Sequence, residues 1–215
     1  MPLHILNSNL WFPPAGEALD DGLLAIGGDL SADRLLLAYR KGIFPWFDGD
    51  VPLWWCPDPR FVLQPGELKV SKSMQQLLKR NPFRFSINTA FAQVIHNCKN
   101  NERKGQNGTW ITDEVEHAYI RLHNLGYAHS AEVWENDQLV GGLYGIRMGR
   151  VFFGESMFSH VSNASKYAFI RYVNVLQQEG VELIDCQVYT AHLESLGAKM
   201  IGRPVFINLL NMLIT

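Results

Sequence analysis

Three predicted strands in direct succession constrain the fold of this 215-residue chain most. They cover residues 128–134, 139–147 and 150–159, and short segments that contain Asn, Asp or Gly separate them. Runs rich in aromatic and β-branched residues between such turns are typical of antiparallel hairpins. We therefore expect an antiparallel meander at the centre of the molecule.

Helical and strand-like patterns alternate after the meander. Apolar residues at helical spacing predict a helix over residues 163–178. A strand is expected over residues 181–189, a short helix over 191–196 and a last strand over 199–207. Together with the meander, this order predicts an α+β fold, a mixed sheet with helices on its faces.

Shorter elements are expected ahead of the meander. The patterns predict a helix over residues 71–80, a strand over 83–87, a helix over 89–98 and a polar loop over 100–108. Thr112 is expected to cap a further helix, whose first turn carries acidic residues that suit the helix dipole.

Residues 1–65 differ from the rest because they are dense in Pro, Trp and Gly. Such a density prevents long elements, apart from one helix that is expected between the N-cap Ser31 and Gly42. We interpret residues 1–65 as a small N-terminal domain and residues 66–215 as the main domain.

The tryptophans of this small domain allow two interpretations. They can form its core, or they can offer exposed rings on which a nucleic acid base stacks. We interpret Trp54 and Trp55 as core, whereas Trp46 follows a proline in a loop and fits either role.

Composition and charge exclude several classes of protein. The formal net charge is −2, so the chain could hold at most a short stretch of nucleic acid through local basic patches. No apolar run approaches the ~18 residues of a membrane-spanning helix, and no secretory signal is visible. The three cysteines form no Cys-x-x-Cys pair, which predicts a reduced, cytoplasmic protein without a zinc site.

The strand at residues 150–159 carries one acid among large apolar side chains. Side chains alternate along a strand, so one face is expected to hold Val151, Phe153, Glu155 and Met157. The other face is expected to hold Phe152, Gly154, Ser156 and Phe158. A carboxylate in such surroundings is costly unless it is neutral, paired or turned to a cavity, so Glu155 is either a buried, bonded group or part of a site.

A second strand places an acid and an amide close together. By the same alternation Leu183, Asp185, Gln187 and Tyr189 share a face. If this strand neighbours the first one, Glu155, Asp185 and Gln187 could line one pocket with apolar walls. A carboxylate takes protons and an amide both donates and accepts hydrogen bonds, so this pocket suits acyl transfer to an amine.

The region from about 128 to 207 is similar to the GNAT acetyltransferase fold. Coenzyme A enzymes of that fold hold pyrophosphate on a glycine-rich loop that follows the fourth strand. The corresponding residues here, 160–166, contain no glycine. This departure argues for an acyl donor other than coenzyme A.

Seven blocks in order along the chain resemble the leucyl/phenylalanyl-tRNA–protein transferase family. Individually each block is weak, but their common order is specific. They include Trp-Trp-Cys-Pro-Asp-Pro-Arg, Gly-Glu-Ser-Met-Phe-Ser and Ile-Asp-Cys-Gln, and lie at residues 22–30, 39–46, 54–60, 108–112, 139–142, 154–159 and 183–187.

The resemblance implies a bacterial, cytoplasmic enzyme of the N-end rule. We further expect a monomer that makes no contact with membranes. Such an enzyme transfers Leu or Phe, and less well Met, from the 3′ end of aminoacyl-tRNA to proteins that begin with Arg or Lys. The modified protein is then degraded. No metal or cofactor is needed, because the aminoacyl ester is already activated.

The resemblance also implies roles for the polar residues. Asp185 would accept a proton from the acceptor amine, and Gln187 would orient the ester carbonyl or its oxyanion. Alternatively, positioning dominates and the departing ribose hydroxyls move the proton. Glu155 would lie at the pocket for the donor amino acid or orient its amine.

Apolar and aromatic residues complete the implied site. Trp46 and Trp110 match the tryptophans that stack on the terminal adenosine, at ~1–3 kcal/mol per base. The walls of the donor pocket would be Leu143, Phe153, Phe169 and Tyr172. Ordinary core packing on a helix stripe is the alternative for Phe169 and Tyr172.

Three other functions compete with this interpretation. The first is a coenzyme A-dependent N-acyltransferase of the GNAT fold. The second is a non-enzymatic module that binds RNA or peptides, in which Asp185 is merely structural. The third is a tRNA-dependent peptidoglycan aminoacyltransferase, whose members do not match the N-terminal Trp/Pro blocks.

Overall fold

The computed structural model describes residues 3–101 and 110–214. Most of the polar loop predicted over residues 100–108 therefore lies outside the described residues. Across the described ranges, no helix combines the length and the apolar character needed to cross a membrane.

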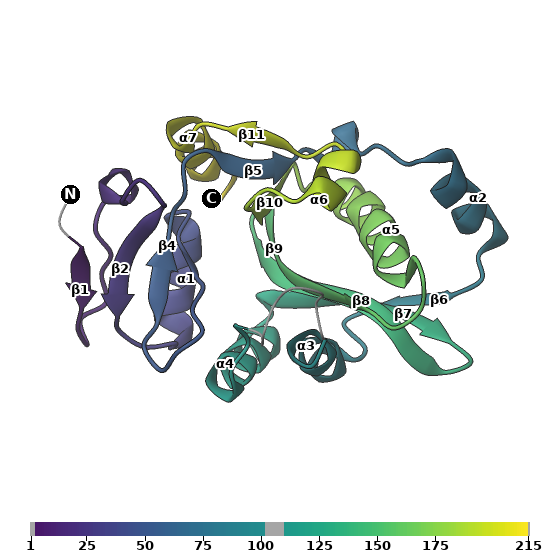
Figure 1. Cartoon of the computed structure of the whole chain (residues 1–215), viewed down its shortest axis with the longest axis horizontal. Helices are drawn as coiled ribbons and strands as arrows, with labels where there is room; N and C mark the ends of the chain where they lie inside the picture. Colours follow the sequence, from purple (N-terminus) through teal and green to yellow (C-terminus); the bar gives the residue numbers. More distant parts are fainter. Residues whose placement is uncertain (1–2, 102–109, 215) are drawn as a thin grey trace.

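A small sheet forms the N-terminal part, at the left of Figure 1. Its strand order is β1 (His4–Leu6), β2 (Leu23–Gly27), β4 (Leu53–Trp55) and β3 (Phe44–Pro45). Helix α1 (Ala32–Arg40) begins as predicted, because the side chain of Ser31 accepts a hydrogen bond from the backbone of Arg34. Trp54 is fully buried, which confirms its place in the core.

A larger mixed sheet carries the rest of the described chain. Its strand order is β11 (Lys199–Ile201), β5 (Arg60–Leu63), β10 (Leu183–Gln187), β9 (Val151–Ser159), β8 (Gln138–Met148), β7 (Ala128–Glu135) and β6 (Arg84–Ile87). The predicted meander is confirmed, since β7, β8 and β9 pair antiparallel. Strand β10 pairs parallel to β9 on one side and antiparallel to β5 on the other.

Helices cover both faces of this sheet, as predicted for an α+β fold (Figure 1). Helix α5 (Ala164–Gln178) packs on one face, and α3 (Phe91–Lys99) and α4 (Asp113–Asn124) pack on the other. Two further helices are α2 (Lys72–Arg80) and α6 (Ala191–Ser195), and short 3₁₀ turns lie at Ala15–Glu17 and Pro65–Glu67. The order of meander, helix and strand on which the GNAT resemblance rests is present.

Strand β5 lies before the predicted domain boundary at residue 65, yet it pairs within the larger sheet. The segment that leaves the small sheet thus becomes an inner strand of the large one, between β10 and β11. The division into residues 1–65 and 66–215 stays a prediction.

The strand predicted over residues 199–207 is wrong beyond residue 201. Strand β11 ends there, and helix α7 (Arg203–Leu213) follows, with a proline in its first turn, where no amide hydrogen is needed. Phe206, Leu210 and Leu213 are buried on one side of this helix, at spacings of four and three residues. This helical spacing continues to residue 213. It is therefore not visible within residues 199–207, the range from which the strand was predicted.

The face assignment predicted for β9 is wrong, because the strand carries a β-bulge at Glu155. Tyr144 of β8 lies opposite Ser156 and Gly145 lies opposite Gly154, so Glu155 is the extra residue. The bulge shifts the alternation by one residue: Phe152 and Met157 pack toward α5, whereas Phe153 and Phe158 pack toward the other face.

Strand β10 contains a second irregularity, at Cys186. Asp185 lies opposite Val62 and Gln187 lies opposite Phe61, so Cys186 has no partner position on β5. Gln187 follows with a φ of 57°, a left-handed conformation that is uncommon for a residue other than glycine. Both central strands are thus irregular at the residues that the sequence singled out.

We expect Gly145→Ala to destabilise the fold strongly, because β8 passes closest to β9 opposite the bulge. A Cβ atom at Gly145 would lie 2.2 Å from the Phe153 carbonyl oxygen and 2.4 Å from Cζ of Phe152. We expect a loss of about 3 kcal/mol in the free energy of unfolding, measured by urea denaturation.

The matched control is Gly16→Ala, since nothing lies within 4 Å of a Cβ atom at Gly16. Its effect should stay within about 0.5 kcal/mol. Equal stabilities of the two variants would contradict the close approach of β8 and β9.

Candidate active site

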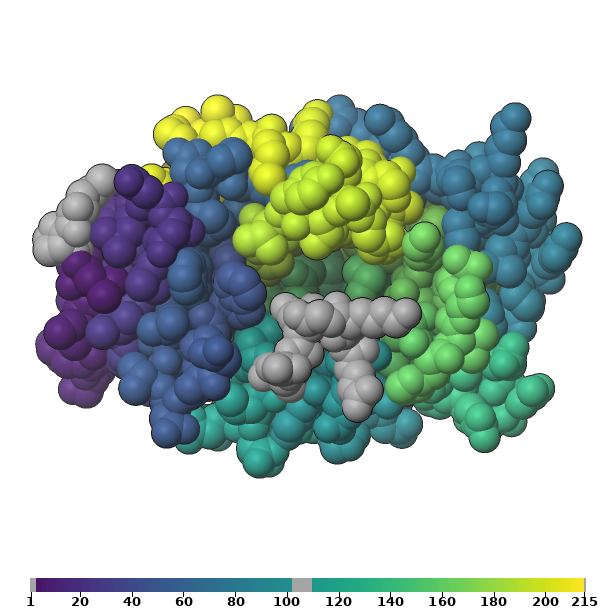
Figure 2. Space-filling view, viewed as in Figure 1, coloured from purple at the N-terminus to yellow at the C-terminus, as the bar shows by residue number. Residues whose placement is uncertain are grey.

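A pocket opens where β9 and β10 separate. Their parallel pairing ends at Asp185 and Phe153, after which β9 continues to Ser159 while β10 ends at Gln187. The space between the two strands is closed by α5 and by the segment that leads into α6. Figure 2 shows this face hollowed between the blue N-terminal segments and the yellow-green segment that carries α6.

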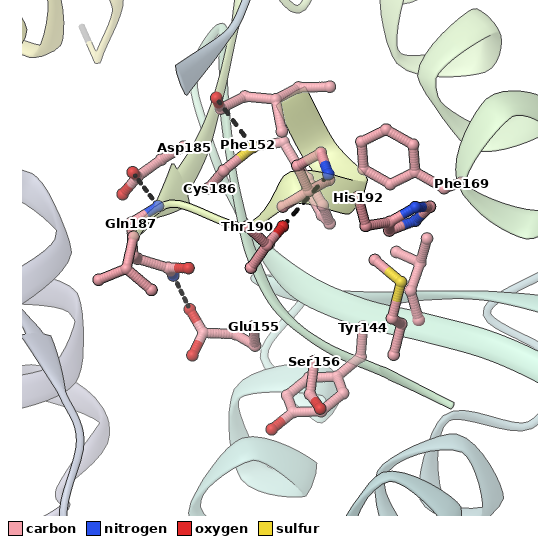
Figure 3. A pocket seen from close by; sticks show the side chains of 16 residues that line it. Tyr144, Phe152, Glu155, Ser156, Phe169, Asp185, Cys186, Gln187, Thr190 and His192 are labelled. Atoms are coloured by element: carbon pink, nitrogen blue, oxygen red, sulfur yellow. Dashed lines mark hydrogen bonds between the residues drawn. The ribbon is translucent and has the colours of Figure 1, made fainter. Parts of the chain in front are cut away.

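The pocket encloses about 300 Å³ and has a polar side and an apolar side. Figure 3 shows Glu155 and Gln187 on the polar side, and Phe169 and His192 on the opposite one. The walls between them are largely apolar and include Leu143, Phe152, Met157, Phe169, Ile184 and Leu193. A pocket of this size with largely apolar walls can accommodate one large apolar amino acid side chain.

Glu155 is partly buried on the bulge and accepts hydrogen bonds from two polar side chains. Tyr119 Oη donates to Oε2 over 3.0 Å, and Gln187 Nε2 donates to Oε1 over 3.3 Å. Tyr39 in turn shares a short hydrogen bond with the hydroxyl of Tyr119. Burial raises the pKa of Glu155 to about 8, although the two tyrosine hydroxyls act in the opposite direction. This carboxyl group therefore titrates close to neutral pH.

Asp185 has a different environment. It is fully buried, and both of its carboxylate oxygens accept hydrogen bonds from Arg60, over 2.8 Å to Nε and 2.6 Å to Nη2. Such a bidentate pair fixes both side chains in one geometry. Oδ1 also accepts the backbone N–H of Gln187 over 2.9 Å, which helps to hold Gln187 in its left-handed conformation.

Arg60 reaches Asp185 from β5 and is itself fully buried. Its guanidinium carbon lies 4.7 Å from the ring centre of Phe44, in β3, and 4.6 Å from that of Phe206, in α7. A guanidinium over two aromatic rings gains cation–π attraction from each of them. The ion pair thus joins the small sheet, the C-terminal helix and the strand that carries Gln187.

The pocket gathers five of the nine residues that the sequence singled out. Glu155, Asp185 and Gln187 lie together as predicted, and Leu143 and Phe169 line the apolar side. Their predicted roles stay predictions.

Phe153 and Tyr172 lie outside the pocket lining. Phe153 is fully buried on the opposite face, where its ring centre lies 5.1 Å from that of Tyr39. Tyr172 packs its ring against Phe152, which does line the pocket. The bulge accounts for Phe153, since it turns Phe152 rather than Phe153 to the pocket.

The two predicted stacking residues are accessible to different degrees. Trp46 is 42% exposed, and its ring centre lies 5.8 Å from that of Trp55, whose indole donates to the Trp46 carbonyl. Trp110 is partly buried and lies edge-on to Tyr119, the residue that bonds Glu155. Neither ring is among the residues that line the pocket.

Sequence reasoning missed three residues that organise the site: Arg60, Tyr39 and Tyr119. Arg60 and Tyr39 both lie in blocks that carry the family resemblance, which was the available signal. Tyr119 is fully buried on α4, the helix that Thr112 caps. No pattern in one sequence shows that its hydroxyl turns to Glu155.

The polar side of the site offers the amide of Gln187, the carboxyl group of Glu155 and the hydroxyl of Tyr119. In the described parts of the chain, no group of three or more His, Cys, Asp or Glu residues could hold a metal ion. An apolar slot beside a hydrogen-bonding amide and a titrating carboxyl group can hold an acyl group and handle the proton of an attacking amine.

Comparisons with known proteins point to one family. A family model described as leucyl/phenylalanyl-tRNA protein transferase matches residues 62–211, and the model of its N-terminal domain matches residues 28–58. A leucyl/phenylalanyl-tRNA–protein transferase of Flavobacterium johnsoniae is 54% identical over 97% of this chain and 99% of its own length. A protein of the same name from Syntrophobacter fumaroxidans is 54% identical over 98% of this chain and 90% of its own length.

Breaking the buried ion pair should destabilise the protein more than breaking an exposed one. We expect Arg60→Met to lower the free energy of unfolding by about 3–5 kcal/mol, because Asp185 is left charged and buried. The double variant Arg60→Met/Asp185→Leu should regain most of this loss. Urea denaturation of the wild-type protein and of the two variants gives the three free energies of unfolding.

Lys199→Met is the control, since its ion pair with Glu67 is about half exposed on both sides. Its cost should stay below about 1 kcal/mol. If Arg60→Met costs no more than Lys199→Met, the pair does not hold the site together.

We expect Glu155 to lower the free energy of unfolding as the pH rises. Its pKa in the folded chain, about 8, exceeds the ordinary value of 4.5, so the folded state binds the extra proton between these pH values. The contribution of Glu155 to the free energy of unfolding is therefore fully present below pH 4.5 and is lost as the pH rises to about 8. Glu155→Gln should remove this part of the slope, by a few kcal/mol at most. Parallel stability curves of the two proteins would contradict the assignment.

Proposed function

The chain belongs to the leucyl/phenylalanyl-tRNA protein transferase family and is an aminoacyltransferase, and we propose that it transfers Leu or Phe, and Met less well, to proteins that begin with Arg or Lys. The donor is aminoacyl-tRNA and the acceptor is the α-amine. The modified protein becomes a substrate of N-end rule degradation. The enzyme works in the cytoplasm, as a monomer, without a cofactor.

The observation that carries this proposal is the pairing of an apolar slot with an amide and a carboxyl group on its polar side. An aminoacyl ester is already activated, so the protein has to place it against an amine and accommodate the charge that develops. Glu155 and Gln187 are suited to this because they lie on the polar side and bond to each other.

The donor side chain would enter the apolar side of the pocket. Leu143 and Phe169, which the family resemblance implies, line it together with Phe152 and Met157. An apolar pocket discriminates one methylene by only ~1–3 kcal/mol, so Leu, Phe and Met overlap as donors. Branching at Cβ widens a side chain close to its backbone, which disfavours Ile and Val by shape.

The terminal adenosine of the tRNA would stack on Trp46 and Trp110. The exposed ring of Trp46 supports this role, as does the contact of Trp110 with Tyr119 beside Glu155. Stacking ignores base sequence, and the net charge of −2 agrees with an enzyme that reads only the end of the tRNA.

Two roles were open for Asp185, proton acceptor or positioning residue, and its surroundings support the second. Both carboxylate oxygens are engaged by Arg60, and the residue has no exposed surface. We therefore assign Asp185 to holding Gln187. The Gln187 side-chain amide would orient the ester carbonyl or its oxyanion.

Coenzyme A-dependent acyl transfer has less support. The start of α5, where a pyrophosphate would be held, bonds to the chain itself. Ala164 donates its backbone N–H to the Val161 carbonyl, and Ser165 donates to the hydroxyl of Ser159. These donors are occupied, and residues 160–166 contain no glycine that would let a phosphate approach.

We expect the protein to transfer radiolabelled Leu from Leu-tRNA to peptides that begin with Arg or Lys. The measurement is acid-stable label on the peptide, and Asp185→Ala should abolish it because Gln187 loses its support. Acetylated peptides of the same sequence serve as controls, since they lack a free α-amine. Label on acetylated peptides, or full activity of Asp185→Ala, would contradict the proposal.

We expect Trp46→Ala and Trp110→Ala each to raise the KM for Leu-tRNA by roughly 5–150-fold, the equivalent of ~1–3 kcal/mol per stacked base. Trp11→Ala is the matched control, because Trp11 is 38% exposed, similar to Trp46. Its KM should stay unchanged. Equal effects of Trp46→Ala and Trp11→Ala would exclude stacking on Trp46.

A further inference from the structure

The pocket contains two carboxylates, and only one of them is free to exchange a proton with a substrate. Arg60 occupies both oxygens of Asp185, which is sealed from solvent. Glu155 is partly exposed and lines the same pocket. Among the residues that the structure describes, no Lys, Arg or His forms an ion pair with Glu155. Its hydrogen bonds come from a neutral hydroxyl and a neutral amide group.

Two buried tyrosines extend the hydrogen bonds of Glu155 away from the pocket. Tyr119 of α4 donates to Glu155, and Tyr39 of α1 shares a hydrogen bond with Tyr119. Both rings are fully buried. Burial raises the pKa of both phenols well above their ordinary value, and the nearby Glu155 raises it further, so both stay protonated and act as donors.

We propose that Glu155 is the catalytic proton acceptor of the transfer reaction and that Tyr39 and Tyr119 are positioning residues that favour its ionised form. This inference rests on the proposed function. It differs from the role that the family resemblance implies, in which the acid of the Asp-Cys-Gln block takes the proton and Glu155 serves the donor.

The proton follows a closed path. The lone pair of the acceptor α-amine attacks the ester carbonyl carbon, and a C–N bond forms. Glu155 takes one proton from the attacking nitrogen. The bond between the carbonyl carbon and the ribose oxygen then breaks, and Glu155 returns the proton to that oxygen. A peptide bond and a free ribose hydroxyl result, and the carboxylate is regenerated.

The charged groups around Glu155 agree with such a cycle. Burial and the nearby Asp185 of β10 raise its pKa, whereas Tyr39 of α1, Tyr119 of α4 and Arg60 of β5 act in the opposite direction. Together these effects give Glu155 a pKa of about 8. A group that must both take and return a proton is most effective when its pKa lies close to the working pH.

The test is the pH dependence of the single-turnover rate at saturating Leu-tRNA and Arg-initial peptide. For the wild-type protein we expect the rate to rise up to a pH of about 8. The α-amine of the peptide also titrates at ~8, so the rise alone does not identify Glu155 as the titrating group. Tyr119→Phe separates the two, because it removes a hydrogen bond to Glu155 and leaves the peptide unchanged.

Loss of that hydrogen bond should raise the pKa of Glu155 and move the midpoint of the rise upward by about one pH unit. The control is Tyr167→Phe, since this buried hydroxyl bonds Asn81 and is not among the groups that affect Glu155. Its midpoint should match that of the wild-type protein. Glu155→Gln should lower the saturated rate by roughly 10²–10⁴-fold.

Two results would overturn the proposal while the transfer activity stands. One is a midpoint that Tyr119→Phe leaves unchanged. The other is a Glu155→Gln variant that reaches the wild-type rate at saturating Leu-tRNA and differs only in KM, which would make Glu155 a donor-binding residue. A wild-type protein that forms no acid-stable product would overturn the proposed function and this assignment together.

Discussion

The buried ion pair of Arg60 and Asp185 is the interaction on which the site depends. It connects four parts of the chain. Arg60 begins β5 and Asp185 lies in β10, and the guanidinium also contacts the rings of Phe44 in the small sheet and Phe206 in α7. A buried pair contributes little net stability, because removing two charges from water is costly. Its value here is geometric: the same carboxylate also holds the backbone of Gln187.

Local irregularities of the strands then place the polar groups of the pocket. An ordinary β9 would turn Glu155 and Phe153 to the same face, and an ordinary β10 would continue its ladder past Asp185. The extra residues Glu155 and Cys186 interrupt both ladders at the same level of the sheet. Bulges commonly occur beside active sites, where they redirect a side chain that regular pairing would bury elsewhere. Here they leave the carboxyl group of Glu155 and the amide of Gln187 facing each other.

The sequence predicts regular structure well and departures from it poorly. The meander, α5 and the caps at Ser31 and Thr112 follow from periodicity and local hydrogen bonding, and the structure contains all of them. The family resemblance implied Phe153 as a pocket wall, and strict alternation put it on the face of Glu155; the one inserted residue breaks that alternation, and Phe153 packs on the opposite face. The partner of Asp185 is 125 residues away in sequence, and no local pattern could reveal it. Family resemblance supplied the position of Arg60 but not its role.

The early end of the pairing between β9 and β10 has a consequence for how this fold can vary. Beyond Asp185 and Phe153 the apolar slot is bounded by side chains, α5 and the approach to α6 rather than by a continuous ladder of backbone hydrogen bonds. Enlarging or narrowing the slot therefore breaks no strand pairing. Substitutions at positions such as Phe169 and Met157 can therefore change the size and shape of the slot while the sheet beside it stays as it is.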